Sequence, residues 1–270
     1  MIKKILLIFS LILIQKIIFA ETIYVSNEKD HNISVIDGNS LEVIKTVKVG
    51  HRPRGIILSK DKKKIIICTS DDNRITVVDA ATLEVDYYLP SGPDPELMVM
   101  DEAGKFIYVA NEDDNMVTVV DYLGKKVVKE IPVGVEPEGM GLSPDGKTLV
   151  NTSETTNMAH FIDTSTLEIK ANVLVDARPR VAQYTGDGKF VWVSSEIGGT
   201  ISIIDAAKLE IIKKIEFKIP GLSKESVQPV GVRLDEKRKL AYVALGPANR
   251  IAVINMKTFE VEKYILTGQR

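Results

Sequence analysis

The sequence predicts an all-β fold, a β-propeller of four-stranded antiparallel blades, with about six blades present. Three observations predict it: a repeat of 42 residues, four Val- and Ile-rich segments in each repeat, and turn signals between these segments. A repeat of about 40 to 45 residues that contains four short strands is typical of a propeller blade.

An aspartate that ends a β-branched run marks the repeat. It recurs every 42 residues, at Asp37, Asp79, Asp121, Asp163 and Asp205. A proline keeps the same interval, at Pro53, Pro95, Pro137 and Pro179. A sixth copy ends at Asn255, 50 residues after Asp205, and Pro229 follows Pro179 by the same 50 residues. Both shifts predict one insertion of eight residues, around residues 218–227.

Residues 1–20 are predicted to be a signal peptide, and residues 21–270 the propeller domain. Two lysines near the N-terminus precede an apolar run, and the segment ends at Ala20, a small residue of the kind that a signal peptidase requires. An uncleaved membrane anchor is the alternative, because Ile18 is larger than the residue usually found near such a cut. Export makes the periplasm the expected location.

Each repeat contains four short apolar segments separated by turns. The third repeat reads ELMVM, a DEAGK turn, KFIYVAN, EDDN, MVTVVD, a YLGK turn and KVVKEIPVG. Asp-Gly turns recur within residues 143–147 and 185–189, where a residue with positive φ reverses an antiparallel pair. Because the third segment is almost wholly apolar, we expect neighbouring blades to stack against it.

The strand count predicts a ring that lacks one strand. The first repeat supplies three strands and five later repeats supply four each, which gives 23 strands, whereas six complete blades need 24. We expect an innermost strand from the C-terminal side to complete the first blade, and the sequence stops just before such a strand. We therefore expect a truncated seven-bladed propeller, with a six-bladed ring that has one three-stranded blade as the alternative.

Charge and cysteine content exclude several classes of function. The formal net charge of -2 shows no bias toward nucleic acid. Cys68 is the only cysteine, which excludes an internal disulfide, a CxxC pair and a CxxCH haem attachment. GxSxG, HExxH and P-loop motifs are absent from the sequence. We expect no cofactor of its own, so PQQ or haem would be contacted only through a partner.

Paired charges flank the proline of the linker that leads into an innermost strand. The pairs are Arg52 and Arg54, Asp94 and Glu96, Glu136 and Glu138, and Arg178 and Arg180. The loops between the second and third strands add Glu28, Glu112, Glu154 and Glu196 at matching repeat positions. Both kinds of segment lie on one face of a disc of four-stranded blades, so we expect these charges around the mouth of the central channel.

Seven of the residues near this mouth are candidate ligand-binding residues: His51, Arg52, Arg54, Glu136, Glu138, Arg178 and Arg180. A guanidinium group presents a planar fork that suits carboxylates and phosphates, so the arginines predict an acidic small ligand. The alternative is that arginines and glutamates pair between adjacent blades and only set the register of those blades.

The histidines do not predict a metal site. His31 and His51 fall on loops of the same face, and no clear third ligand accompanies them. His160 occupies a strand position that other repeats fill with serine or threonine, so we expect it to pack in the core.

Two further features have structural interpretations. Trp192 shares a second-strand position with Tyr24, Tyr108 and Tyr242, where an aromatic ring is expected to pack between blades. The acidic turns at residues 71–73 and 113–115 suit Asx turns better than a calcium site.

Three features of the sequence resemble the YVTN family of β-propeller repeats. They are the segments IYVSN (residues 23–27) and IYVAN (residues 107–111), the strands that end in VID or a variant of it, and the linker pattern VG-x-x-P-x-G. The charges in HRPRG, VEPEG and ARPR are also similar to those of the β-propeller proteins associated with PQQ-dependent catabolism. The resemblance covers essentially all of residues 21–270. It implies a seven-bladed propeller, export, and an accessory role beside quinoprotein dehydrogenases and c-type cytochromes.

The resulting functional expectation is a periplasmic, noncatalytic propeller that binds a partner protein or an acidic small ligand at its channel face. The implied partner is a periplasmic quinoprotein dehydrogenase or a c-type cytochrome, with no nucleic acid and no membrane span after signal cleavage. One alternative is a hydrolase similar to propeller lactonases, for which His51, Glu136 and Glu138 are the candidate residues. Another is an envelope or surface interaction module, because propellers serve many functions.

Overall fold

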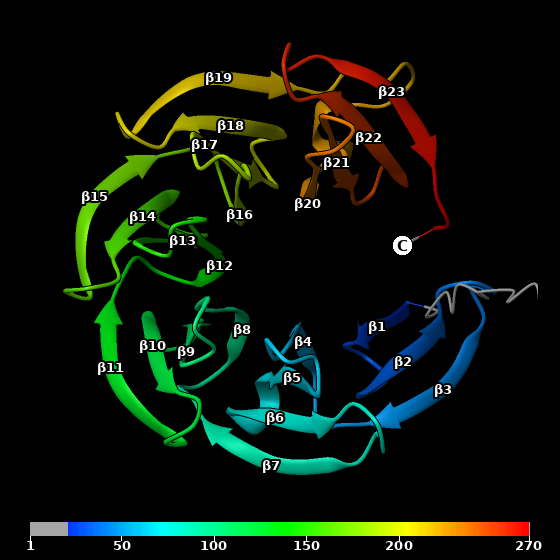
Figure 1. The fold of residues 1–270 in the computed structure, drawn as a ribbon. Coiled ribbons are helices and arrows are strands. Elements are labelled where there is room, and N and C mark those ends of the chain that lie inside the picture. The colour runs from blue at the N-terminus through cyan, green and yellow to red at the C-terminus, as the bar shows by residue number, and fades with distance from the viewer. Residues whose placement is uncertain (1–20, 270) are drawn as a thin grey trace, which may run out of the picture.

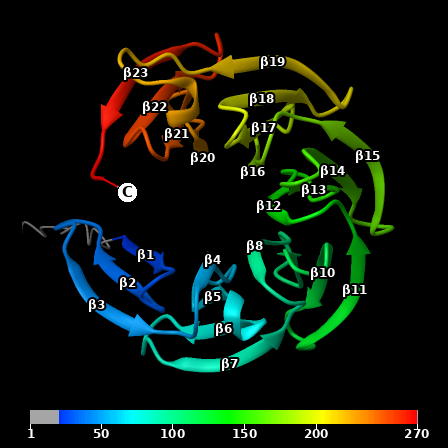
Figure 2. The ribbon, with the colours of Figure 1, turned by 180° about the vertical axis from the view of Figure 1, so that it is seen from behind.

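Short Val- and Ile-rich segments become the strands of a β-propeller. The computed structural model describes residues 21–269 and contains six antiparallel sheets, five with four strands and the first with three. The sheets form six blades around a central axis (Figures 1 and 2). The predicted signal peptide, residues 1–20, lies outside the described residues.

Each four-stranded blade runs from an inner strand beside the axis to an outer strand at the rim (Figure 1). The inner strands are β4 (Pro53–Leu58), β8 (Pro95–Met100), β12 (Pro137–Leu142), β16 (Pro179–Tyr184) and β20 (Pro229–Asp235). The second strands are β1 (Thr22–Asn27), β5 (Lys64–Thr69), β9 (Phe106–Asn111), β13 (Thr148–Ser153), β17 (Phe190–Ser195) and β21 (Leu240–Leu245).

The third strands are β2 (Asn32–Asp37), β6 (Arg74–Asp79), β10 (Met116–Asp121), β14 (Met158–Asp163), β18 (Thr200–Asp205) and β22 (Arg250–Asn255). The outer strands are β3 (Val43–Lys48), β7 (Val85–Pro90), β11 (Lys126–Pro132), β15 (Glu168–Leu174), β19 (Glu210–Glu216) and β23 (Val261–Leu266). Two short 3-10 turns, at Ser70–Asp72 and Lys224–Ser226, complete the described elements.

The repeated aspartate organises the turn between the third and outer strands. In the second blade, Asp79 Oδ1 accepts the backbone N–H groups of Ala81 and Thr82, both at 3.0 Å. The chain then passes through Leu83 with a positive φ of 61°, and the Leu83 N–H bonds the Asp79 carbonyl at 2.8 Å. The carboxylate thus accepts backbone N–H groups in a tight Asx turn, which explains why an aspartate ends five of the third strands and Asn255 ends the sixth.

The core consists of apolar layers between adjacent blades. Trp192 of β17 is fully buried in one such layer, together with Phe217 and with Val232 and Val243 of the sixth blade. Tyr108 of β9 is 3% exposed, which confirms the predicted packing role of this second-strand position, and Tyr24 and Tyr242 are half-buried. Since each blade covers its faces with its neighbours, stability arises between blades rather than inside one.

The predicted insertion lies between the fifth and sixth blades. The linker between β19 and β20 spans residues 217–228, whereas the linker between β3 and β4 spans residues 49–52, a difference of eight residues. The longer linker contains the 3-10 turn Lys224–Ser226 and buries Ile219 and Val227. The insertion therefore adds a packed loop without changing the strand pattern.

The first blade has three strands, and the ring is open between β23 and β1 (Figures 1 and 2). The count of 23 strands and about six blades is confirmed, and the seven-bladed ring stays a prediction. Within residues 21–269, no helix is long and apolar enough to cross a membrane.

Candidate functional site

The linkers hold the first charged residue of each pair in an unusual backbone conformation. Arg52, Asp94, Glu136 and Arg178 all have positive φ, between 47° and 58°. A side chain of the preceding blade accepts the backbone N–H of each of these residues, namely His31 Nδ1, Asn73 Oδ1, Asn115 Oδ1 and Asn157 Oδ1. Non-glycine residues rarely adopt this conformation, and it persists where surrounding contacts enforce it. The repeat thus positions these four residues equivalently.

The second charged residue of each pair lies on an inner strand. Glu138 of β12 binds Arg54 of β4 at 3.2 Å and Arg180 of β16 at 3.0 Å through its Oε1 atom. The side chain of Glu138 is only 6% exposed, and that of Glu96 on β8 is fully buried. Arg54 also forms a close ion pair with Glu96. The structure therefore brings together Arg54, Glu138 and Arg180, three of the predicted residues, from three blades.

The two first-position arginines extend this network. Arg52 binds both oxygens of Asp94, at 2.7 Å and 2.8 Å, and Glu96 at 3.0 Å. Arg178 binds Glu154 at 2.7 Å and Glu196 at 3.3 Å, both through Nε. All four arginines are therefore paired with carboxylates, as the alternative interpretation of the sequence expected.

Two of the predicted residues lie outside this ion-pair network. Glu136 accepts a short hydrogen bond from the hydroxyl of Thr155. His51 has a 67% exposed side chain and pairs through Nδ1 with Asp72 at 2.8 Å. Because Glu138 is occupied by two arginines, the three residues proposed for a hydrolase have separate partners and share no hydrogen bond.

Carboxylates that were not among the predicted ligand-binding residues complete the arrangement. We call the following set the charged mouth: Glu28, Arg52, Arg54, Asp94, Glu96, Glu112, Glu136, Glu138, Glu154, Arg178, Arg180 and Glu196. It contains eight carboxylates and four guanidinium groups. Among the added carboxylates, the loop glutamates are identified in the sequence by their spacing at multiples of 42 residues, namely Glu28, Glu112, Glu154 and Glu196. Asp94 and Glu96 are identified by their position beside a linker proline.

Burial changes the protonation of several of these carboxylates. Burial, followed by the nearby charge of Glu138, raises the pKa of Glu96 to about 9. Burial is also the largest cause that raises the pKa of Glu112 and the pKa of Glu154. Low solvation disfavours the charged form of a carboxylate, whereas the ion pairs of Glu96 with Arg52 and Arg54 favour it. Carboxylates outnumber arginines in the mouth.

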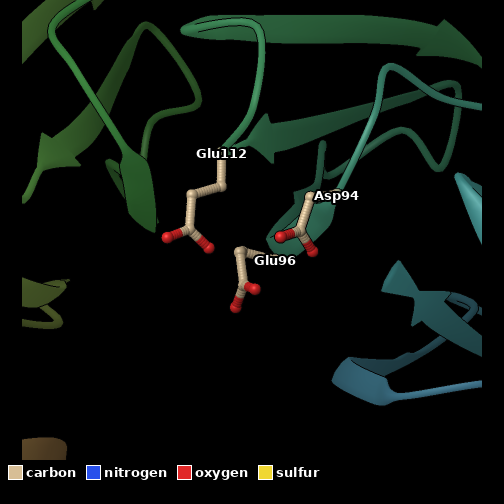
Figure 3. A group of neighbouring side chains, drawn as sticks. All are labelled: Asp94, Glu96 and Glu112. Carbon is tan, nitrogen blue, oxygen red and sulfur yellow. The ribbon is translucent and has the colours of Figure 1, made fainter. Parts of the chain in front are cut away.

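Asp94, Glu96 and Glu112 lie next to one another (Figure 3), with one oxygen of each within 4.8 Å of the others. This is the only group in residues 21–269 with the spacing of metal ligands. Arg52 already binds Asp94 and Glu96, and Arg54 also pairs with Glu96. Since guanidinium groups compensate two of the three carboxylates, the cluster alone does not indicate a metal site.

Side chains of the acidic turn at residues 71–73, and His31, accept hydrogen bonds from the backbone of the linkers. Asn73 Oδ1 accepts the N–H of Asp94 at 3.0 Å, and Asp72 Oδ2 accepts the N–H of His51 at 2.9 Å. His31 Nδ1 accepts the N–H of Arg52 at 3.0 Å, so His31 takes the place that asparagine occupies in other blades. These contacts hold the linkers against the blades on either side of them.

His160 of β14 is buried, which confirms its expected place in the core. Its Nε2 accepts the N–H of Gly134 at 3.0 Å, and its Nδ1 lies 2.6 Å from Asn172 Oδ1. This arrangement suits a neutral ring with the proton on Nδ1. Burial lowers the pKa of His160, because it disfavours the charged form.

We expect a His160→Thr variant to lose part of the pH dependence of folding. The unfolded chain binds a proton on His160 below about pH 6.5, and the folded protein, in which this pKa is lowered, does not. The contribution of His160 to stability is therefore complete above that pH and decreases as the pH falls toward the lowered pKa. Urea unfolding at several pH values should show that the free energy of unfolding decreases less on acidification in the variant than in the unmodified protein. Identical pH profiles would contradict this assignment.

Comparison with known proteins supports the fold alone. No protein-family model matches the sequence, and no curated protein sequence matches it. Among solved structures, hydrazine synthase of Kuenenia stuttgartiensis superposes with a TM-score of 0.82, at 21% identity, over 92% of this chain and 84% of that chain. At this level of identity the similarity establishes a shared β-propeller architecture, and it assigns no family to this protein.

Proposed function

We propose that the protein is an exported, noncatalytic binding propeller that recognises a partner protein at its charged mouth. The partner presents a basic surface to this mouth. In line with the family resemblance, the proposed partner is a periplasmic quinoprotein dehydrogenase or a c-type cytochrome, and the proposed role is accessory to PQQ-dependent alcohol oxidation.

The excess of carboxylates over arginines is the observation that carries this proposal. Eight carboxylates face four guanidinium groups, and each guanidinium already has carboxylate partners. Glu112 and Glu136 are half-buried, and no ion pair with a cationic side chain involves them within the described chain. Complementary charge favours encounter with a basic surface and adds specificity more than affinity.

We expect a Glu112→Gln, Glu136→Gln double variant to bind the partner about tenfold more weakly, mainly because association is slower. The immobilised protein should retain a quinoprotein dehydrogenase or c-type cytochrome from a periplasmic extract at about 50 mM salt and release it at about 500 mM, because salt screens exposed charges. Mass spectrometry and the haem spectrum would identify the retained protein.

The matched control is Glu130→Gln, which removes an exposed carboxylate from the outer strand β11, away from the inner strands. This control should retain the partner as the unmodified protein does. Equal retention by the double variant, or retention that salt does not weaken, would refute a charge-based interface at the mouth.

An acidic small ligand is a second candidate, supported by Arg178. Its side chain is 44% exposed, and its ion pairs with Glu154 and Glu196 are both formed through Nε rather than through the terminal nitrogens. Calorimetry with citrate as the probe should then detect binding that an Arg178→Ala variant loses. Unchanged heats in that variant would eliminate this candidate.

A further inference from the structure

The long linker between the fifth and sixth blades lines a pocket. Residues 217–228 connect β19 with β20, whereas each of the four other linkers between blades has four residues. A cavity of about 450 Å³ lies between this linker and Gly199, in the loop that joins β17 to β18. Pockets for small molecules typically measure about 300–1,000 Å³. The insertion therefore creates a candidate ligand site outside the charged mouth.

Gly199 has no side chain at a position where three other blades use an asparagine. The repeat of 42 residues makes Gly199 the counterpart of these asparagines, namely Asn73, Asn115 and Asn157. All four residues have positive φ, between 53° and 67°. A Cβ atom at Gly199 would lie 3.4 Å from the Val227 carbonyl oxygen and 3.6 Å from Lys224 Cε. A side chain at this position would thus contact the long linker, and the pocket exists partly because glycine stands there.

The long linker is held in place by hydrogen bonds. The N–H of Val227 donates to the Lys224 carbonyl at 3.0 Å and closes the 3-10 turn Lys224–Ser226. The N–H of Lys218 donates to the hydroxyl of Tyr264 on β23 at 3.2 Å. Because the pocket is formed by a linker with these contacts, a ligand does not have to order the loop at a cost in affinity.

The pocket has an apolar floor. Phe217, Ile219 and Val227 line it, and they are between 2% and 8% exposed because they belong to the core layer between the fifth and sixth blades. Pro220 and Leu222 also line it, and Leu222 is 37% exposed. An apolar group in the pocket would remove this carbon surface from water, which favours binding.

Two lysines of this pocket have no carboxylate partner. Lys218 and Lys224 line it and are exposed, and neither forms an ion pair within residues 21–269. Asp176 lies near Lys224, but its Oδ1 atom already binds Lys214 Nζ at 2.6 Å. Glu216 is the only carboxylate among the described residues that line the pocket. The lining side chains therefore carry a net positive charge.

We propose that this pocket binds a small amphipathic anion. Its apolar body contacts Phe217, Ile219 and Leu222, and its carboxylate, sulfonate or phosphate group is held by Lys218 and Lys224. An ammonium group acts as a compact point charge without a fixed fork, so the site accepts any of these anionic groups. The site lies outside the charged mouth, so this inference does not depend on the proposed partner protein.

Fluorescence titration of the whole protein with anilinonaphthalene sulfonate tests the proposal, because this probe combines apolar rings with one sulfonate. Its uncharged analogue, phenylnaphthylamine, is the matched probe. A Lys218→Gln, Lys224→Gln double variant should bind the sulfonate about fivefold more weakly, since two exposed charge pairs are lost. Binding of the uncharged probe should stay the same. The control is Lys208→Gln, an exposed lysine in the turn between β18 and β19, which should leave the binding of both probes unchanged.

Gly199→Asn tests the pocket itself. Asparagine tolerates positive φ and stands at this position in other blades, so the far-UV circular dichroism spectrum should stay the same. Its side chain would occupy part of the pocket, so both probes should bind about tenfold more weakly.

Three results would overturn the proposal. Sulfonate binding that Gly199→Asn leaves intact would place the probe elsewhere on the protein. Equal weakening of the two probes in the double lysine variant would show that the lysines do not recognise the anionic group. Equal weakening of sulfonate binding by Lys208→Gln and by the double variant would reveal a general attraction to positive charge instead of a site.

Discussion

Replacement of Arg54 by methionine is expected to lower the free energy of unfolding by about 3–5 kcal/mol, the range found when one partner of a buried ion pair is removed. Arg54 is 17% exposed and lies between Glu96 and Glu138, which are buried. Without the guanidinium group, Glu138 keeps only Arg180 among its ion-pair partners, and Glu96 keeps only Arg52. Buried carboxylates with too little positive charge nearby are costly, so the ring should be weakened between the second and fourth blades.

Arg178→Met is the matched control for this experiment. Its side chain is 44% exposed, and its buried partner Glu154 keeps Arg180 as a second ion-pair partner, so we expect a smaller loss of stability than for Arg54→Met. Urea unfolding followed by far-UV circular dichroism should therefore separate the two variants clearly. Equal losses for the two variants would show that the buried network contributes no more than an exposed ion pair.

Replacement of Trp192 by alanine is expected to lower the free energy of unfolding by about 3–5 kcal/mol, the usual range for a large aromatic residue in a core. Trp192 is fully buried, and its ring lies 5.8 Å from that of Phe259 in the sixth blade. The cavity left by alanine would separate the fifth blade from the sixth. Because Trp192 is the only tryptophan, unfolding must be followed by circular dichroism rather than by intrinsic tryptophan fluorescence.

Trp192→Phe provides the control at the same position. The Trp192 Nε1 atom is buried and has no hydrogen-bond partner among the described residues, so phenylalanine removes an unsatisfied donor while it keeps much of the ring. We expect its loss of stability to be well below that of the alanine variant. A loss as large as that of alanine would mean that ring volume is not what holds these two blades together.

The sequence was sufficient to predict the strands and their grouping. Asp79 and its counterparts recur because the same Asx turn closes each blade, and β-branched runs mark the third strands because these are covered on both faces. The insertion before Pro229 was visible as a change in spacing, and the structure contains it as a longer linker. Local patterns of this kind report local structure, which is why the fold was predictable.

The sequence also placed the charges on one face, but it did not determine their partners. Arg54 and Glu138 are 84 residues apart and come from blades that are not adjacent in the chain. Which carboxylate such an arginine meets depends on how closely the inner strands approach the axis. The spacing of 42 residues carries no information on that distance, so the sequence left ion pairs between blades and an acidic ligand as alternatives.

The amino-acid sequence by itself determined the repeat, the four-strand blade and the shared face of the charged residues, because these follow from hydrophobic periodicity and turn chemistry within about 40 residues. Only the tertiary structure decided that Glu138 bridges two arginines, that Glu96 is buried, and that Ile23 and Val25 are exposed within residues 21–269. The physical reason is that ion pairing, desolvation and edge exposure depend on distances between blades, which arise only when the whole ring is assembled.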